Sequence, residues 1–292
     1  MRRFRYDGDG SWFKGNTHIH STMSDGGWTF AELEAAYGGA GYDFLFRTDH
    51  WVTSRAEQDG GDLLWLDGVE LDGFDEQGSY YHVVCLGTFE GIARELGFPA
   101  ALAAVRDQGG LLILAHPLWT GNTGEEATRW GFDGVEIYNH VCRWLNGKGD
   151  GRAHWQAMLR DAPATLAIAS DDAHTTASHP GWNGGWIMVQ APELKVDAIL
   201  AALRGGRFYS TMGPTFRTIT YDGSSVIAQT SPVQFARLVG PGFHGQRHGN
   251  FEGESFEHVS FEVPDDWAYA YLEIEDGCGR RAWTNTLFMD PA

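Results

Sequence analysis

His18 and His20 open a series of residues that could hold metal ions. Side chains two residues apart on a β-strand point to the same face, so both imidazoles can reach one ion. An isolated His-x-His pair is a weak indicator, because surface and core histidines produce the same pattern. Further ligand residues are therefore needed before the pair predicts a metal centre.

Such residues recur along the chain, most of them just after a short apolar run. They are Asp25, His50, Glu70, His82, His116, Asp172 and His174. Imidazole and carboxylate ligands without thiolates suit Mn, Fe or Zn better than Mg or Ca alone. Three divalent ions held by six neutral histidines and three carboxylates leave a local charge of about +3, which would attract an anionic substrate.

The elements that must position these residues are short strands alternating with helices between about residues 13 and 213, a pattern typical of an α/β fold with a largely parallel sheet. We expect strands at Phe13–His20, Phe44–Asp49, Leu64–Glu70, Tyr80–Leu86, Leu111–Ala115, Val135–Tyr138, Leu166–Ser170 and Trp186–Gln190. We expect helices at Thr29–Gly38, Pro99–Gln108, Ala153–Arg160 and Val196–Leu203. Most ligand candidates then lie at carboxyl ends of strands, where such folds place their chemistry.

The pattern changes after Pro214. Short alternating runs at Thr215–Tyr221, Phe256–Val263 and Tyr269–Ile274 are separated by Gly, Pro and Asp, without an amphipathic helix. This predicts a small antiparallel β-rich module packed on the main domain. We therefore expect one domain over residues 1–213 and a second over residues 214–292.

The ordered motifs HIHSTMSDG, TDH, GVE, AHP, EIYN and SDDAH resemble the PHP domain, named for polymerase and histidinol phosphatase. WFKGN before the first motif and RFYSTMGP near residue 213 are similar to the carbaryl-hydrolase-like branch of PHP metallohydrolases. The resemblance implies a distorted (β/α)7, TIM-like barrel that binds two or three divalent ions at the carboxyl ends of its strands.

The resemblance also implies how the ligands divide among the ions. The residues for the first ion would be His18, His20, Glu70 and Asp172. Glu70 would bridge to a second ion held with His82 and His116. Asp25, His50 and His174 would hold the third. Each of these nine positions carries a residue able to bind a metal.

These features predict a metal-dependent phosphoesterase that acts on a small phosphate ester through a metal-activated water. We expect Glu70, Asp172 and His174 to be catalytic. The sequence contains no GxSxG motif, so it does not indicate a serine nucleophile. A hydrolase of carboxyl esters, carbamates or amides is the alternative, since the same metal site could attack an acyl carbon. A non-catalytic metal-binding or sensing module is an alternative of another class.

Candidate substrate contacts are fewer and rest on weaker patterns. Recognition of phosphate usually requires Arg or Lys beside the metals. The candidates are Arg143, Lys148 and Arg152, in a polar stretch that a solvated loop would explain equally well, together with His140 and His179. Trp51, Trp119 and Trp182 closely follow site segments and could line an apolar part of the pocket. Asp49 and Asp171 adjoin ligand candidates and are expected to orient them.

Composition limits the partners. The 292 residues carry a formal net charge of −18, which disfavours binding to long nucleic acids. Three scattered cysteines indicate neither a disulfide framework nor a thiolate zinc site. No apolar run is long enough to span a membrane, and no signal peptide is visible. We expect a cytoplasmic protein with a small anionic substrate; the sequence does not predict its oligomeric state.

Overall fold

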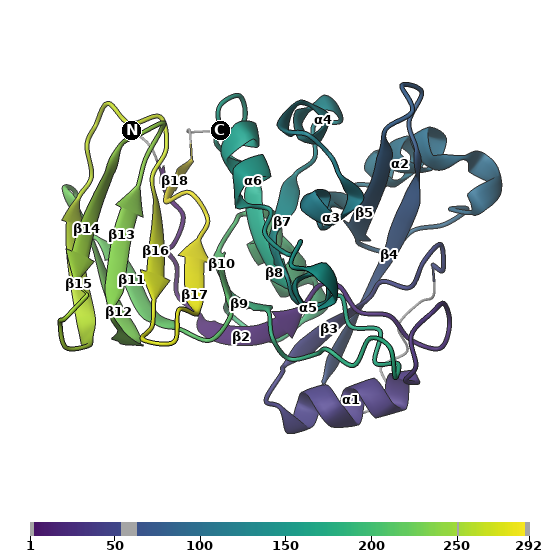
Figure 1. Cartoon of the computed structure of the whole chain (residues 1–292), viewed down its shortest axis with the longest axis horizontal. Helices are drawn as coiled ribbons and strands as arrows, with labels where there is room; N and C mark the ends of the chain where they lie inside the picture. Colours follow the sequence, from purple (N-terminus) through teal and green to yellow (C-terminus); the bar gives the residue numbers. More distant parts are fainter. Residues whose placement is uncertain (1–2, 54–62, 250, 290–292) are drawn as a thin grey trace.

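The computed structural model describes residues 3–53, 63–249 and 251–289. The described strands form a 13-stranded sheet, a 3-stranded sheet and a pairing of β1 (Arg3–Phe4) with β18 (Phe288–Met289). Strands in the large sheet follow the order β14-β13-β16-β17-β10-β9-β2-β3-β4-β5-β6-β7-β8. Figure 1 shows the helix-bearing part of the chain beside a stack of strands from its last third.

The helix-bearing part is built on seven consecutive strands close to those predicted. They are β2 (Ser11–Asn16), β3 (Phe44–Arg47), β4 (Leu64–Phe74), β5 (Tyr80–Leu86), β6 (Leu111–Leu114), β7 (Gly134–Asn139) and β8 (Leu166–Ser170). Pairings within β2–β3–β4 and within β6–β7–β8 are parallel, as expected. However, β5 is antiparallel to both its neighbours, because the turn from β4 to β5 is too short for a crossover helix.

The described strands do not form the closed barrel that was expected, because β8 does not pair with β2. Within the described residues, β8 is an edge of the sheet. An isolated bridge between Ile19 and Ala173 joins the segments beyond β2 and β8. The edge amides of Ala167 and Ala169 instead donate to side-chain oxygens of Asn285 and Ser210, at 2.8 Å each. These side chains satisfy the edge that a strand would otherwise pair with.

Predicted helices occur within two residues of their expected ends. They are α1 (Phe30–Gly39), α2 (Phe98–Asp107), α6 (Arg152–Met158) and α7 (Val196–Arg204). A capping box between Thr29 and Glu32 starts α1. Three further short helices were not predicted, since they are too short for a helical repeat. They are α3 (Pro117–Thr120), α4 (Gly124–Arg129) and α5 (His140–Asn146).

The large sheet also contains strands from the last third of the chain. After β9 (Trp186–Ala191), which is antiparallel to β2, β10 (Phe208–Thr211) pairs with β17 (Arg281–Thr284). The sheet continues through β16 (Tyr271–Glu275), β13 (Phe235–Val239) and β14 (Gly245–Gly249). A second sheet contains β11 (Phe216–Tyr221), β12 (Ser225–Val233) and β15 (Phe256–Glu262). The boundary between residues 213 and 214 stays a prediction.

Apolar side chains on the two faces of β5 explain how the fold supports a site. Val83 and Cys85 face one buried cluster, while Val84 and Leu86 face another. His82 lies on the same face as Val84 and Leu86, since side chains alternate along a strand. The cluster containing Val84 and Leu86 therefore packs on the face of β5 from which the His82 side chain projects.

No helix in the described part of the chain is long and apolar enough to cross a membrane.

Candidate metal centre

Two loops beyond β2 and β8 hold the first ligand candidates against each other. The amide of His20 donates to the Ala173 carbonyl, and the amide of Asp172 donates to the His18 carbonyl, both at 2.9 Å. The Nε2 atoms of His18 and His20 lie 3.1 Å apart. Both imidazoles are fully buried. The side chains therefore converge as the His-x-His spacing predicts, although the residues lie beyond the end of β2.

Glu70 lies at the centre of the cluster. It is buried on β4. Its carboxylate oxygens lie between 2.7 and 3.4 Å from imidazole nitrogens of five residues, which are His18, His20, His50, His82 and His116. A buried carboxylate among so many imidazoles is suited to bridging metal ions.

Asp172 forms a second centre beside Glu70. Its Oδ1 atom lies 3.2 Å from His18 Nε2 and 3.1 Å from His20 Nε2, and its Oδ2 atom lies 3.8 Å from His116 Nε2. Asp172 and His116 have positive φ angles of 54° and 27°, which non-glycine residues rarely adopt. Such conformations cost energy and cluster at functional sites. Here they direct two side chains into the same cluster.

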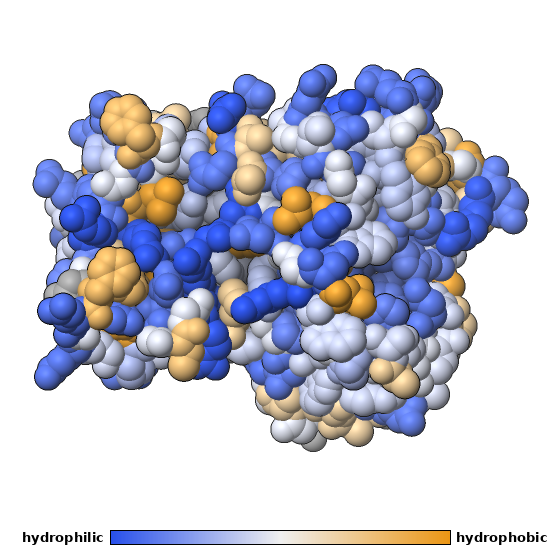
Figure 2. Space-filling model, viewed as in Figure 1, coloured by the Kyte–Doolittle hydropathy of each residue, from blue (hydrophilic) through white to orange (hydrophobic). Residues whose placement is uncertain are grey.

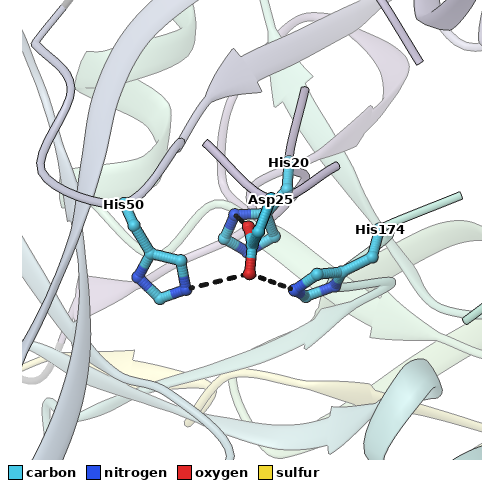
Figure 3. A group of neighbouring side chains, drawn as sticks. All are labelled: His20, Asp25, His50 and His174. Carbon is cyan, nitrogen blue, oxygen red and sulfur yellow. Dashed lines mark ion pairs between the residues drawn. The ribbon is translucent and has the colours of Figure 1, made fainter. Parts of the chain in front are cut away.

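Asp25 forms an outer group with three histidines (Figure 3). Its carboxylate lies 3.3 Å from His174 Nε2, 3.4 Å from His20 Nδ1 and 3.9 Å from His50 Nε2. The Asp25 side chain is 53% exposed, whereas His20 is buried. The group therefore lies at the solvent side of the cluster.

The donor atoms fit divalent cations. In each of four overlapping groups, ligand atoms lie within 4.8 Å of one another. The buried Nδ1 atom of His20 has no hydrogen-bond partner among the described residues, although it lies 3.4 Å from Asp25 Oδ1. An imidazole nitrogen left without a partner among carboxylates is suited to a metal bond, because burial without any partner is costly. The nine side chains predicted from sequence thus come together; their metal binding remains a proposal.

The grouping overlaps with the implied division without reproducing it. The four groups are His20–Asp25–His50–His174, His18–Glu70–His116, His18–His20–Asp172 and His50–Glu70–His82. His82 groups with His50 and Glu70, although His82 Nδ1 and His116 Nε2 both approach Oε1 of Glu70, at 2.7 and 3.4 Å. His20 belongs to an inner group and to the outer one, because its two ring nitrogens face opposite sides.

Charges in the cluster shift pKa values strongly. Burial alone would lower the pKa of His20, but hydrogen bonds to Asp172 and Glu70 raise it to about 10. The pKa of His18 is also raised, since Asp172, Glu70 and Glu136 outweigh its burial. Burial opposes ionisation of Asp172, yet neighbouring histidines hold its pKa well below the usual range. Metal ions bind neutral imidazole, so binding at these histidines would release protons.

Glu136 is a site residue that sequence reasoning did not assign. This buried β7 residue accepts a hydrogen bond from His18 Nδ1 at 2.8 Å and from the His116 amide at 2.9 Å. Asn139 donates to both Glu136 and Asp172, at 2.8 and 3.2 Å. Glu136 therefore fixes the ring of His18 so that Nε2 faces the cluster. Glu136 is the first residue of the EIYN motif, but the motif alone did not reveal its hydrogen bond with His18.

Replacing Glu136 with glutamine is expected to weaken metal binding about 10- to 100-fold, because the His18 ring loses its anionic partner. Titration calorimetry with Mn²⁺ measures the effect. Glu273→Gln is the matched control, since Glu273 is also buried but contacts Trp283 and Arg237 instead. Equal affinities for the Glu136 variant and the unmodified protein would contradict this role.

Asp72 and Arg94 were also missed. Asp72 lies 3.2 Å from His50 Nδ1, and its pKa falls to about 2 because His50 and Arg94 outweigh burial. Arg94 pairs with Asp72 at 3.0 Å. Neither residue stands in a recognisable motif, so only the fold brings them beside the site.

Asp49 and Asp171 support the loops, as expected from sequence. Asp49 accepts hydrogen bonds from the Ser21 amide and hydroxyl, both at 2.8 Å. Asp171 accepts from the Tyr37 hydroxyl at 2.8 Å and from the amides of Gly184 and Gly185. Neither carboxylate belongs to the ligand groups. Both instead anchor the backbone that carries neighbouring ligands.

The cluster opens into a cavity of about 510 Å³. That volume is typical of small-molecule sites. Besides ligand candidates, its walls contain Tyr80, Trp119, Val141, Cys142, Leu145, Thr176, Ser178 and His179. Of the predicted substrate contacts, His179 therefore reaches the cavity. Among the three tryptophans considered, Trp119 lines it, whereas Trp182 packs on Trp28 and Tyr37.

The other predicted substrate contacts lie elsewhere. Arg143 and Arg152 line a different cavity of about 290 Å³, with Trp283 and Arg281. Lys148 is exposed and lines neither cavity. The remaining candidate, His140, accepts or donates a 3.0 Å hydrogen bond with the Tyr138 hydroxyl. His140 and Arg143 lie on α5, which sequence patterning did not predict, whereas Lys148 follows α5 and Arg152 begins α6.

Comparisons with known proteins identify a shared fold. No protein-family model matches the sequence, and no curated protein matches it significantly. A solved two-domain protein from Bacteroides vulgatus, described as containing a predicted PHP-like metal-dependent phosphoesterase, superimposes with a TM-score of 0.52 and 14% identity. The match covers 95% of this chain and 96% of that one. The two chains therefore have the same overall fold.

Two other solved structures are more distant. A candidate metal-dependent phosphoesterase from Bifidobacterium adolescentis has a TM-score of 0.43 and 17% identity, over 60% of this chain and 92% of that one. An amidohydrolase from Chromobacterium violaceum, with bound sulfate and no metal, has a TM-score of 0.22 and 22% identity, over 64% and 63%.

Proposed function

We propose that this chain is a PHP-type metallohydrolase, a phosphoesterase that cleaves a small phosphate ester at a di- or trinuclear metal site. One observation carries the proposal: six imidazoles and three carboxylates from distant segments come together in one cluster, and all of them except His18 and His20 line a single cavity. A structural metal site needs only about four ligands in a closed shell. A cluster of nine candidates that borders an open cavity supports catalysis better than a purely structural role.

In the proposed enzyme, some residues hold the metal ions and others orient the residues that hold them. Glu70 and Asp172 would hold the inner ions together with the histidines around them, and His174 and Asp25 would complete the outer position. When bound, Mn, Fe or Zn supplies a coordinated water with a pKa of about 7 and neutralises developing negative charge. Glu136 and Asp72 orient the rings of His18 and His50. Cavity walls exclude part of the bulk water and leave room for a small substrate.

Hydrolysis of a carboxyl ester, carbamate or amide is the second candidate. The supporting observation is the scarcity of cations around the cavity: within its described lining there is no Arg or Lys, and Trp119, Val141 and Leu145 make one wall apolar. The similarity of the sequence to the carbaryl-hydrolase-like branch also favours this second candidate. A cytoplasmic location and a small anionic substrate remain predictions from the sequence.

Release of p-nitrophenol from matched esters tests the proposal. The substrates are p-nitrophenyl phosphate, bis(p-nitrophenyl) phosphate and p-nitrophenyl acetate, each with Mn²⁺ supplied and with chelator added. We expect chelator-sensitive turnover of a phosphate ester. Turnover of the acetate alone would favour the second candidate. A metal content near one ion, without hydrolysis of any ester, would favour a non-catalytic binding module.

A further inference from the structure

The cavity over the ligand cluster continues into a second opening with a different character. This opening, about 400 Å³, is lined by Ser24, Asp25, His50, Asp72, Tyr80, His82 and Arg94. Four of these residues, Asp25, His50, Tyr80 and His82, also line the larger cavity. Ligand candidates thus lie between two ends, one containing Arg94 and the other containing the apolar side chains of α3 and α5.

At the first end, Arg94 is held in place but still accessible. Its Nη1 and Nη2 atoms donate to the two Asp72 oxygens at 3.3 and 3.0 Å, and its guanidinium lies 5.2 Å from the Trp51 ring centroid. The side chain is 59% exposed. A guanidinium has five N–H donors, so donors remain beyond the Asp72 pair. The pair is neutral overall; it offers directed donors rather than excess charge.

At the opposite end, Trp119, Val141 and Leu145 form what we call the apolar wall. The Trp119 ring stands edge-on to His116 and His82, with centroids 5.1 and 5.7 Å away. Trp119 and Leu145 are each 37% exposed. The face of the molecule in Figure 2 is largely hydrophilic, with small, separate hydrophobic patches.

We propose that the site binds its ester in one orientation, with the outer phosphate oxygens toward Arg94 and an apolar ring on the apolar wall. The inference rests on the proposed function and adds the class of substrate, namely phosphate esters of ring-bearing alcohols. Charge-assisted donors suit phosphate oxygens, and aromatic side chains bind flat apolar groups through area burial and edge contacts. The cavity of about 510 Å³ has room for both parts.

Benzyl phosphate and ethyl phosphate separate the two ends, because both release a simple alcohol and only one carries a ring. In Trp119→Ala, KM for benzyl phosphate is expected to rise about tenfold, while KM for ethyl phosphate changes less than about twofold. Trp144→Ala is the matched control, since Trp144 is on α5, 53% exposed and outside the lining of either opening. Equal changes for both substrates in Trp119→Ala would overturn the assignment of the apolar wall.

Arg94→Gln tests the other end. We expect KM to rise about tenfold for both phosphates, because each would lose the same charge-assisted hydrogen bonds. Arg217→Gln is the matched control. Arg217 is on β11, is 52% exposed and forms an ion pair with Glu257 at 2.7 Å, just as the exposed Arg94 forms one with Asp72. An unchanged KM in Arg94→Gln would overturn the placement of the phosphate.

Binding of benzylphosphonate, measured by calorimetry with Mn²⁺ present, provides a readout that needs no turnover. The expected pattern is weaker binding in both Trp119→Ala and Arg94→Gln and unchanged binding in both controls. That pattern without phosphate hydrolysis would contradict the proposed function but support the orientation. Phosphate hydrolysis with unchanged phosphonate binding in both site variants would support the function and overturn the orientation.

Discussion

Replacing Asp172 with alanine is expected to lower the turnover of a phosphate ester about a thousandfold, because a bound ion supplies several kcal/mol and each ~1.4 kcal/mol is a factor of ten. The carboxylate lies within 3.2 Å of the Nε2 atoms of both His18 and His20. Its loss removes the anionic partner of both imidazoles at once. Steady-state rates with saturating Mn²⁺ measure the effect.

A matched control separates chemistry from folding. Asp75 is also buried and pairs with Arg129 at 2.6 Å, but it lies outside the ligand groups. Asp75→Ala is expected to lower the melting temperature while leaving turnover per folded molecule unchanged. Asp172→Ala should instead keep a cooperative melting transition. A near-normal rate in Asp172→Ala would refute its assigned role.

Removing the metal ions is expected to abolish turnover and to lower the melting temperature by roughly 8 °C. A ligand present at 1,000 times its dissociation constant stabilises the folded state by about 4 kcal/mol. In a chain of this size, each kcal/mol shifts the melting temperature by about 2 °C. Without ions, ion pairs between histidines and the buried Glu70 and Asp172 would still hold the cluster together. The protein is therefore expected to remain folded.

Scanning calorimetry before and after chelator treatment tests this expectation, and adding Mn²⁺ back should restore both stability and turnover. Asp172→Ala should show a smaller thermal shift, because it binds the ions more weakly. A chelated protein with unchanged melting temperature and unchanged turnover would contradict metal dependence altogether. Loss of turnover alone would instead mean that the ions contribute little to folding.

Local sequence was sufficient to predict the strands that precede the candidate ligands. The runs at Tyr80–Leu86 and Leu166–Ser170 have the predicted boundaries. Apolar β-branched and aromatic residues favour strands, and Thr29 with Glu32 starts a helix, so both signals are contained in a few neighbouring residues. The sequence also placed His50, His116 and Asp172 just after strands, as in the structure. Glu70 was expected at the end of its strand but lies within β4, which continues to Phe74.

Topology departed from expectation where the signal was not local. The pattern within β5 does not reveal that it runs antiparallel, since a buried apolar run looks the same in either direction. The short connection from β4, which extends beyond its predicted end to Phe74, decides the direction. The pattern also does not reveal that the edge of β8 is satisfied by Ser210 and Asn285, more than 40 residues away along the chain. Strand direction and edge coverage depend on long-range pairing, which periodicity within one segment cannot contain.

The sequence by itself determined the kinds of donor atoms, their order along the chain and the acidic surface around them. Tertiary structure decided which donors lie close together, so that His20 faces two groups and five imidazoles surround Glu70. It also decided that Arg94, rather than Arg143, lies beside the cluster. The physical reason is that residue type is a local property, whereas distances between side chains on different loops depend on how the whole sheet twists and packs.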